Sequence, residues 1–185
     1  PHRLGELTAL WASGVLSEQD YFFLAKARGK AMAPPEDPNF DTGTMLAVKG
    51  DVAKIKQELI AFPEITLANW NSDNQIVLAG AKPAIAKIQQ HLADQGFSVI
   101  PLPVSAAFHT PLVEHAQKPF AKAIHSVKFN PPAVRLYSNT SGKAHSTDPQ
   151  KIRKVLEGHI LNPVLFRDEI ENIYAEGGYF FIEFG

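Results

Sequence analysis

Apolar residues recur at helical spacing near the start of the chain. The positions are Leu4, Leu7, Leu10 and Trp11. Their intervals of three and four residues predict a helix over residues 4–13, which Gly14 terminates. A second helix is predicted over residues 17–32, because Ser17 and Asp20 have the spacing of a capping box ahead of an apolar run.

A different pattern occupies residues 44–104, where short apolar runs and amphipathic stretches follow one another. Residues 33–43, rich in proline and aspartate, precede this pattern and are interpreted as a surface connection. The predicted elements are a strand at 44–50, a helix at 51–62, two strands within 65–80, a helix at 81–96 and a strand at 97–104. The order βαββαβ is typical of a ferredoxin-like unit, so this region is interpreted as an inserted subdomain.

Helices and extended segments alternate again after the insertion. Helices are predicted at 112–127, 148–161 and 166–178, an extended segment at 133–143 and a final strand at 179–184. Because helices and strands flank the insertion on both sides, the fold class is interpreted as α/β. Residues 1–43 and 105–185 are expected to form a partial α/β-hydrolase-like core that is incomplete at both ends.

Composition narrows the classes of function. The net charge of −1 gives no field that would attract nucleic acid or an acidic membrane. The absence of cysteine excludes disulfides, thiolate metal sites and a cysteine nucleophile. No apolar run approaches the roughly 18 residues of a membrane span. We therefore expect a cytoplasmic protein with no nucleic acid and no membrane among its partners.

The first candidate for chemistry is the beginning of the chain. His2 and Gly5 flank a position at which hydrolases and acyltransferases carry a nucleophilic serine, exposed where a turn feeds a helix. Here that position holds Arg3. A guanidinium stays protonated and has no lone pair suited to attack, so covalent catalysis through Arg3 is excluded. Ser105, four residues before His109, lacks the geometry of a substitute nucleophile.

Three segments together resemble one enzyme family. His2, Gly5 and Glu6 match part of its Gly-His-Ser-x-Gly-Glu motif. Arg28 lies 25 positions after the nucleophile position, as the family's carboxylate-binding arginine does. His109 follows a short strand after the insertion, as the family's catalytic histidine does. The chain thus resembles the malonyl-CoA:acyl carrier protein transacylases and the acyltransferase domains of polyketide and polyunsaturated fatty acid synthases.

The resemblance extends along essentially the whole chain. Residues 68–80 resemble the family's asparagine-rich hairpin, residues 159–166 its helix ending in Asn-Pro-Val, and residues 181–185 the start of its closing Glu-x-Gly-Pro-Gly. It implies transfer of a malonyl group from coenzyme A to the phosphopantetheine thiol of an acyl carrier protein, by a serine and histidine ping-pong mechanism in fatty acid or polyketide synthesis. The implied partners are the acyl carrier protein, malonyl-CoA and neighbouring synthase domains, with no tightly bound cofactor.

The resemblance also assigns roles to individual residues. His109 would be the general base, Arg28 would bind the malonyl carboxylate, and the backbone N–H of Leu4 would help to hold the oxyanion. His2 would belong to the substrate-binding side of the motif. Because Arg3 occupies the position of the nucleophile, this chain is predicted to be inactive. Arg3 has two explanations: an artificial residue at the start of an excised fragment, or natural loss of the nucleophile.

Several of these residues also have simpler interpretations. Taken alone, His109 would be a packed or capping histidine and Arg28 a solvated helix residue, and only the ensemble of motifs promotes them. Phe108 either selects malonyl over branched donors by its bulk or packs in the core. His159 and Asn162 are minor candidates for the site.

The remaining histidines have no spacing that pairs metal ligands. They are His91, His115, His125 and His145. We interpret them as surface residues and predict no metal site. Two other functions stay open: a non-catalytic module that binds a carrier protein or acyl-CoA, and a serine hydrolase of the same architecture, which would have no need for Arg28.

Overall fold

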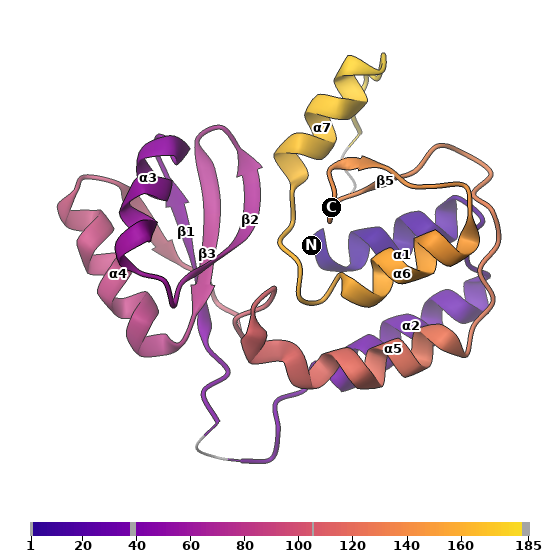
Figure 1. Ribbon diagram of the computed structural model, residues 1–185, viewed down its shortest axis with the longest axis horizontal. Helices are drawn as coiled ribbons and strands as arrows, with labels where there is room; N and C mark the ends of the chain where they lie inside the picture. Colours follow the sequence, from indigo (N-terminus) through magenta and orange to yellow (C-terminus); the bar gives the residue numbers. More distant parts are fainter. Residues whose placement is uncertain (1, 38–39, 105, 183–185) are drawn as a thin grey trace.

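Two lobes make up the described part of the chain (Figure 1). A computed structural model describes residues 2–37, 40–104 and 106–182, except for the side chains at positions 2, 3 and 111. We call residues 44–104 the sheet lobe and the described residues on either side of it the helical lobe. Within these ranges, no helix is both long and apolar enough to cross a membrane.

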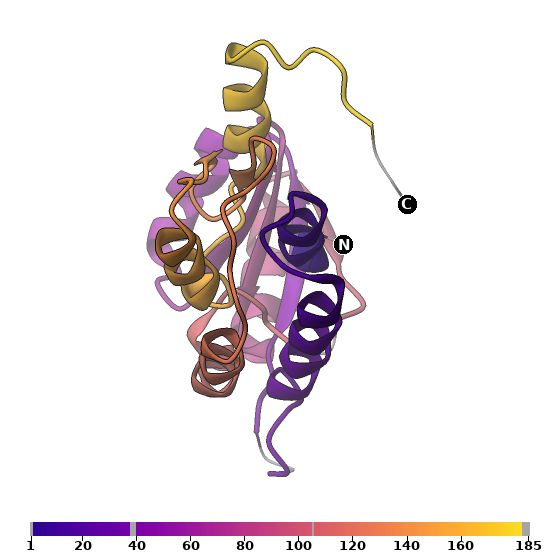
Figure 2. The same ribbon diagram turned by 90° about the vertical axis from the view of Figure 1, so that its right-hand side faces the viewer.

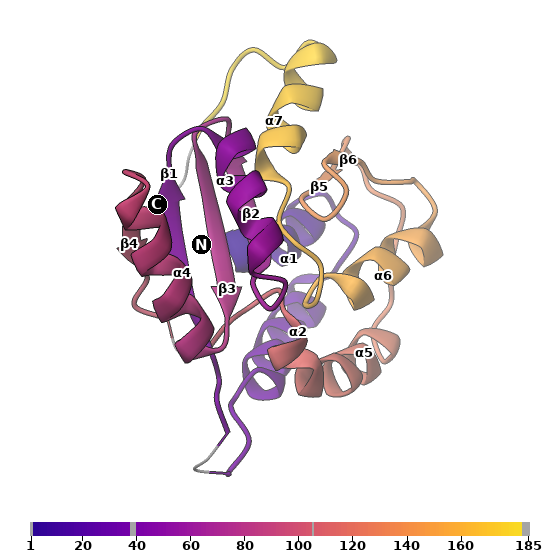
Figure 3. The ribbon, with the colours of Figure 1, turned by 60° about the vertical axis from the view of Figure 1, so that its left-hand side comes forward.

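The sheet lobe contains a four-stranded antiparallel sheet. Its strands are β1 (Thr44–Lys49), β2 (Thr66–Ser72), β3 (Gln75–Gly80) and β4 (Ser98–Pro101), arranged in the order β2-β3-β1-β4. The connections contain α3 (Val52–Glu58), the short 3-10 helix η1 (Leu59–Ala61) and α4 (Lys82–Asp94). Figure 3 shows α3 and α4 on the same side of the sheet. The elements follow one another in the order βαββαβ.

The two faces of this sheet have different surroundings because side chains alternate along each strand. One face, with Leu46 and Val48 of β1, packs against the apolar residues of α3 and α4. The opposite face carries Met45 and Ala47 of β1 and Val77 of β3. This second face is directed towards the helical lobe, where it forms part of a cavity described below.

Most helices of the helical lobe pack around one apolar core. The helices are α1 (His2–Ala12), α2 (Glu18–Ala31), the 3-10 helix η2 (Pro111–Ala116), α5 (Gln117–His125), α6 (Pro149–Gly158) and α7 (Phe166–Ala175), of which α7 contributes no buried residue to this core. Helix α2 packs against α1 and α5, and α5 packs against α6, an arrangement visible in Figure 2. Leu10, Leu24, Phe120 and Leu156, one from each of these four helices, are fully buried in that core.

Local signals determine the start of α2. The Ser17 hydroxyl accepts a hydrogen bond from the backbone N–H of Asp20 at 3.1 Å, which satisfies one of the free N–H groups in the first turn. The cap predicted at Ser17 is therefore confirmed.

Few strands occur in the helical lobe. Over its described residues they are β5 (Tyr137–Ser138) and β6 (Lys143–Ala144), which form a short hairpin. The strand predicted at 179–184 is wrong over residues 179–182, which form no strand and leave Phe180 97% exposed. Residues 183–185 lie outside the described ranges. An apolar segment becomes a strand only where a neighbouring strand completes its hydrogen bonds, and no described strand pairs with residues 179–182.

Candidate functional site

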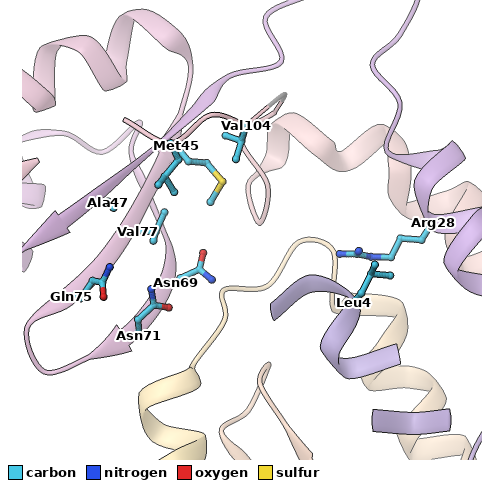
Figure 4. A pocket seen from close by; sticks show the side chains of 10 residues that line it. Leu4, Arg28, Met45, Ala47, Asn69, Asn71, Gln75, Val77 and Val104 are labelled. Atoms are coloured by element: carbon cyan, nitrogen blue, oxygen red, sulfur yellow. The ribbon is translucent and has the colours of Figure 1, made fainter. Parts of the chain in front are cut away.

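A cavity of about 500 Å³ lies between the two lobes. Its floor is the second face of the sheet, with Met45, Ala47 and Val77, and the facing wall carries Leu4 of α1 and Arg28 of α2. Figure 4 shows the guanidinium of Arg28 pointing from α2 towards the sheet. The cavity thus combines an apolar floor with a positive charge on the opposite wall.

Arg28 is a buried cation without a protein partner for part of its guanidinium. The residue is 6% exposed, and its Nε and Nη2 have no hydrogen-bond partner within the described residues. Burial lowers the pKa of Arg28 to about 10, although the charge of Glu6 acts in the opposite direction. The side chain still carries its proton at neutral pH. A planar guanidinium can form two parallel hydrogen bonds with a carboxylate, so a carboxylate in the cavity would satisfy these groups.

Three side-chain amides that sequence reasoning did not select border the same cavity. They are Asn69 and Asn71 of β2 and Gln75 of β3. A bulge between residues 67 and 69 shifts the register of β2 and places Asn69 opposite Val77, on the cavity face. The signal in the sequence was the pair of polar residues two positions apart within a predicted strand. Amides both donate and accept hydrogen bonds, so this side of the cavity can bind polar groups of a ligand.

The beginning of α1 borders the cavity through Leu4. The first N–H groups of a helix have no acceptor within the helix, so the N–H of Leu4 can bind an anion. Position 3 lies in the same first turn. The side chains of His2 and Arg3 are outside the described structure, and so is Ser105 as a whole.

His109 lies in the segment that follows the sheet lobe. It is 1% exposed and has a backbone φ of +62°, in the left-handed region that few non-glycine residues adopt. Its Nδ1 lies 2.7 Å from the backbone oxygen of Asn162. Because a carbonyl oxygen only accepts, Nδ1 carries a proton, and in the neutral ring Nε2 carries the lone pair. Nε2 can therefore accept a proton from another group.

The acceptor of His109 belongs to a segment that joins the lobes. Val164 pairs with the edge of β2: its N–H donates to Ala68 and its oxygen accepts from the N–H of Trp70, both at 2.8 Å. Asn162 lies two residues earlier and provides its backbone oxygen, not its side chain, to His109. The hydrogen bonds between Val164 and β2 therefore help to hold the backbone oxygen of Asn162, which in turn orients the His109 ring.

Phe108 and His109 do not line the cavity in the described structure. Phe108 is partly buried and packs against both the helical core and the second face of the sheet. Val104, five residues before His109, does line the cavity. The structure therefore brings Arg28 and Leu4 together on one wall of the cavity, whereas His109 is not among the residues that line it.

Glu6 of α1 is a buried carboxylate surrounded by donors. Ser138 Oγ donates to Oε1 at 2.9 Å, His145 Nε2 lies 3.1 Å from the same oxygen, and His159 Nε2 lies 3.3 Å from Oε2. Burial alone would raise the pKa of this carboxyl group, but the hydrogen bond from His145 and the charge of His159 outweigh burial and lower it. Glu6 is therefore ionised at neutral pH.

Two histidines, His145 and His159, are more deeply buried than their sequence context indicates. The interpretation of His145 as a surface residue is wrong, because its side chain is only 2% exposed and faces Glu6. His159, a minor candidate from the sequence, is equally buried between Glu6 and Asn139. Its ring lies edge-on to that of His109, with centroids 5.9 Å apart.

The other three histidines lie at or near the surface. His91 pairs with Glu58 and is partly exposed, His125 pairs with Glu157, and His115 is exposed. Among the residues with described side chains, no group of three or more histidine, aspartate or glutamate residues could hold a metal ion.

Comparisons with known proteins give a consistent result. A family model described as "Acyl transferase domain" matches residues 1–184. One polyunsaturated fatty acid synthase polypeptide of Thraustochytrium sp. is 34% identical over 187 residues, which cover 100% of this chain and 6% of that protein. Malonyl CoA-acyl carrier protein transacylase of Escherichia coli K12 is 33% identical over 183 residues, which cover 95% of this chain and 58% of that protein.

Solved structures give the same likeness. Malonyl CoA-acyl carrier protein transacylase from Clostridium perfringens has a TM-score of 0.84 at 31% identity, with 94% of this chain and 55% of that chain covered. The chain therefore spans little more than half the length of these transacylases and a small part of the synthase.

Proposed function

The chain belongs to the acyl transferase domain family, and from this premise we propose that it serves the transfer of a malonyl group from coenzyme A to the phosphopantetheine thiol of an acyl carrier protein. The observation that carries the proposal is Arg28, a buried guanidinium with unpartnered N–H groups in the cavity between the lobes. A malonyl thioester presents a free carboxylate at the end opposite its sulfur. An acetyl thioester has no such group, so Arg28 favours a dicarboxylic donor.

The cavity has polar groups suited to the rest of such a donor. Asn69, Asn71 and Gln75 lie on the sheet side. Their amides can exchange hydrogen bonds with a thioester carbonyl or with the amide groups of a pantetheine arm. With Arg28 on the facing wall, the donor would lie across the cavity with its carboxylate towards α2.

Transfer of this type uses a hydroxyl at position 3. The hydroxyl gives its proton to Nε2 of His109 and attacks the thioester carbon, while the N–H of Leu4 stabilises the oxygen that becomes negative. The carbon–sulfur bond then breaks, and the thiol of coenzyme A leaves with the proton from His109. The thiol of the carrier protein reverses these steps and receives the malonyl group, which restores the hydroxyl.

Arg3 prevents this covalent step in the present chain. At neutral pH a guanidinium keeps its protons and has no nucleophilic lone pair with which to attack the thioester. We therefore propose that the chain binds a malonyl donor without forming an acyl intermediate. A second candidate function is a non-catalytic module that holds acyl-CoA or docks a carrier protein. It is favoured by a different observation, which is that Arg3 occupies the nucleophile position while Arg28 still faces the cavity.

The architecture is also part of the proposal. We assign residues 1–43 and 105–185 to a partial α/β-hydrolase-like core and residues 44–104 to an inserted ferredoxin-like subdomain. The strand order β2-β3-β1-β4 and the two helices on one face of the sheet support the second assignment. The 34% identity to a polyunsaturated fatty acid synthase supports neighbouring synthase domains as partners.

Covalent loading tests the catalytic proposal. The unmodified chain, Arg3→Ser and Arg3→Ala are incubated with malonyl-CoA labelled in the malonyl group, and protein-bound label is counted after denaturation. We expect label on Arg3→Ser only, and its loss when His109→Ala is added. Labelling of Arg3→Ala, or equal labelling of Arg3→Ser by acetyl-CoA, would contradict the proposal. If Arg3→Ser binds malonyl-CoA tightly but acquires no label, the catalytic proposal is wrong and the non-catalytic binding module takes its place.

A further inference from the structure

Glu6 is a buried charge close to the position that the nucleophile would occupy. Residues 3 and 6 are three positions apart in α1, so both lie on the same side of the helix. The side chain of Glu6 is only 1% exposed. An ionised carboxylate at such a site is costly unless donors surround it. The polar groups around Glu6 come from segments distant in the sequence, and one of them, His159, lies next to His109.

His159 connects Glu6 to His109. Its Nε2 lies 3.3 Å from Oε2 of Glu6 and 3.1 Å from Oδ1 of Asn139. The contact with Asn139 is a hydrogen bond to an amide oxygen, which only accepts, so Nε2 carries a proton and the ring is held in this orientation. Oε2 of Glu6 lies within ion-pair distance of the same nitrogen but forms no hydrogen bond within the described part of the chain. That ring stands at 82° to the ring of His109. In an edge-to-face contact the positive edge of one ring meets the negative face of the other, which restricts rotation of the His109 ring.

We propose that Glu6 is a positioning residue for His109, acting through His159 to hold the His109 ring in the orientation in which Nδ1 donates to Asn162 and Nε2 is unprotonated. The His109 backbone supports this assignment, because a φ of +62° is retained only where the surrounding contacts hold the residue. The consequence for acyl transfer rests on the proposed function, whereas the effect on the ring itself does not.

Other charged groups also face Glu6 and determine how the test is designed. Arg28 on α2 and Glu169 on α7 both interact with its charge, and His145 approaches Oε1 from the segment after β6. Loss of the Glu6 charge therefore alters several groups at once. A control must remove a carboxylate that pairs with a histidine elsewhere. Glu58 is suited to this, because it pairs with His91 at 2.6 Å in the sheet lobe.

The test measures the tautomer of His109 directly. Nitrogen-15 spectra of the imidazole rings are recorded at a pH where the rings are neutral, for the unmodified chain, Glu6→Gln and Glu58→Gln. We expect the ratio of the Nδ1–H to the Nε2–H form of His109 to fall by roughly threefold to tenfold in Glu6→Gln, about the effect of one buried hydrogen bond. The ratio is expected to stay unchanged in Glu58→Gln. Backbone amide spectra check that each variant is folded.

A second variant and a second readout keep the inference separate from the function. If Glu6→Gln does not fold, His159→Gln removes the ring next to His109 but keeps an N–H donor for Asn139, and the same fall is expected. In the Arg3→Ser background, Glu6→Gln should lower the loading rate at saturating donor by roughly tenfold to a hundredfold, with little change in KM.

Failure of Arg3→Ser to load would overturn the proposed function but leave the tautomer comparison valid. Equal His109 tautomer ratios in Glu6→Gln and Glu58→Gln would overturn the positioning role, whatever the loading result. If Glu6→Gln is unfolded, an unchanged ratio in His159→Gln would overturn it in the same way.

Discussion

Replacing Arg28 with methionine should make the folded chain more stable. In the absence of ligand, Arg28 holds a charge in a largely buried position with two N–H-bearing nitrogens unpartnered. Methionine keeps an unbranched stem that can pack along α2 but has no charge to desolvate. Gain of stability on loss of a charged residue is the opposite of what most substitutions at buried positions produce.

The magnitude follows from the effect of burial on the side chain. Burial lowers the pKa of Arg28 to about 10. Since the pKa is lower in the folded chain than in the unfolded chain, the unfolded chain binds the proton more tightly, and the cost to folding is fully present below about pH 10. A fall in pKa from 12.5 to about 10 corresponds to a loss of roughly 3 kcal/mol in the free energy of unfolding. Imperfect packing of the methionine offsets part of it, so a net gain of about 1–2 kcal/mol is expected.

Chemical and thermal denaturation at pH 7 measure this gain. For a chain of this size, the expected increase in Tm is about 2–8 °C. Lys30→Met is the matched control, because Lys30 is exposed on the same helix, and its effect should stay within about 0.5 kcal/mol. Added malonate should raise the Tm of the unmodified chain but not that of Arg28→Met. A loss of stability in Arg28→Met, or an equal response of both proteins to malonate, would refute this reasoning.

Three further substitutions test the electrostatics and the packing around the site. Burial, reinforced by the charge of Glu6, raises the pKa of Glu169 from 4.5 to about 7. An acid with a raised pKa costs the folded chain stability as the pH rises from 4.5 to 7, so Glu169→Gln should become relatively more stable over that range. The gain above pH 7 should be on the order of 1–2 kcal/mol because the group is partly exposed, and a difference independent of pH would contradict it. Gly43→Ala should destabilise the chain by about 2–4 kcal/mol, since Gly43 has a φ of +71° and a Cβ there would lie 2.6 Å from the backbone oxygen of Gly80. Gly29→Ala, with open space around it on α2, should instead stabilise by about 0.5–1 kcal/mol, and equal effects of the two in urea denaturation would disprove the packing argument.

Some features of the fold could be predicted because their causes are local. The Ser17 cap depends on residues three positions apart, and the order of strands and helices in residues 44–104 follows from hydrophobic alternation. The strand predicted at the end of the chain is wrong over residues 179–182, because these residues have the apolar character of a strand but no described strand to pair with. A strand depends on its partner as well as on its own composition.

The candidate site likewise has features that local sequence predicts and features that depend on contacts between distant segments. The position of Arg28 in the sequence identified it as a candidate, but its burial depends on how α2 packs against the other helices and faces the sheet. The contact of Glu6 with His145 and His159 joins residues more than 130 positions apart, so no local pattern reports it. Asn69 was missed for another reason: a bulge in β2 decides which face of the sheet it occupies.

Selective binding of a malonyl donor tests the central claim most directly. Isothermal titration of the unmodified chain with malonyl-CoA and with acetyl-CoA gives the ratio of the two Kd values. We expect malonyl-CoA to bind roughly tenfold to a hundredfold more tightly, the difference that charge-assisted hydrogen bonds to Arg28 provide. Arg28→Met should lose this preference while its affinity for acetyl-CoA stays unchanged. Equal affinities for the two donors in the unmodified chain, or a preference that persists in Arg28→Met, would contradict the account.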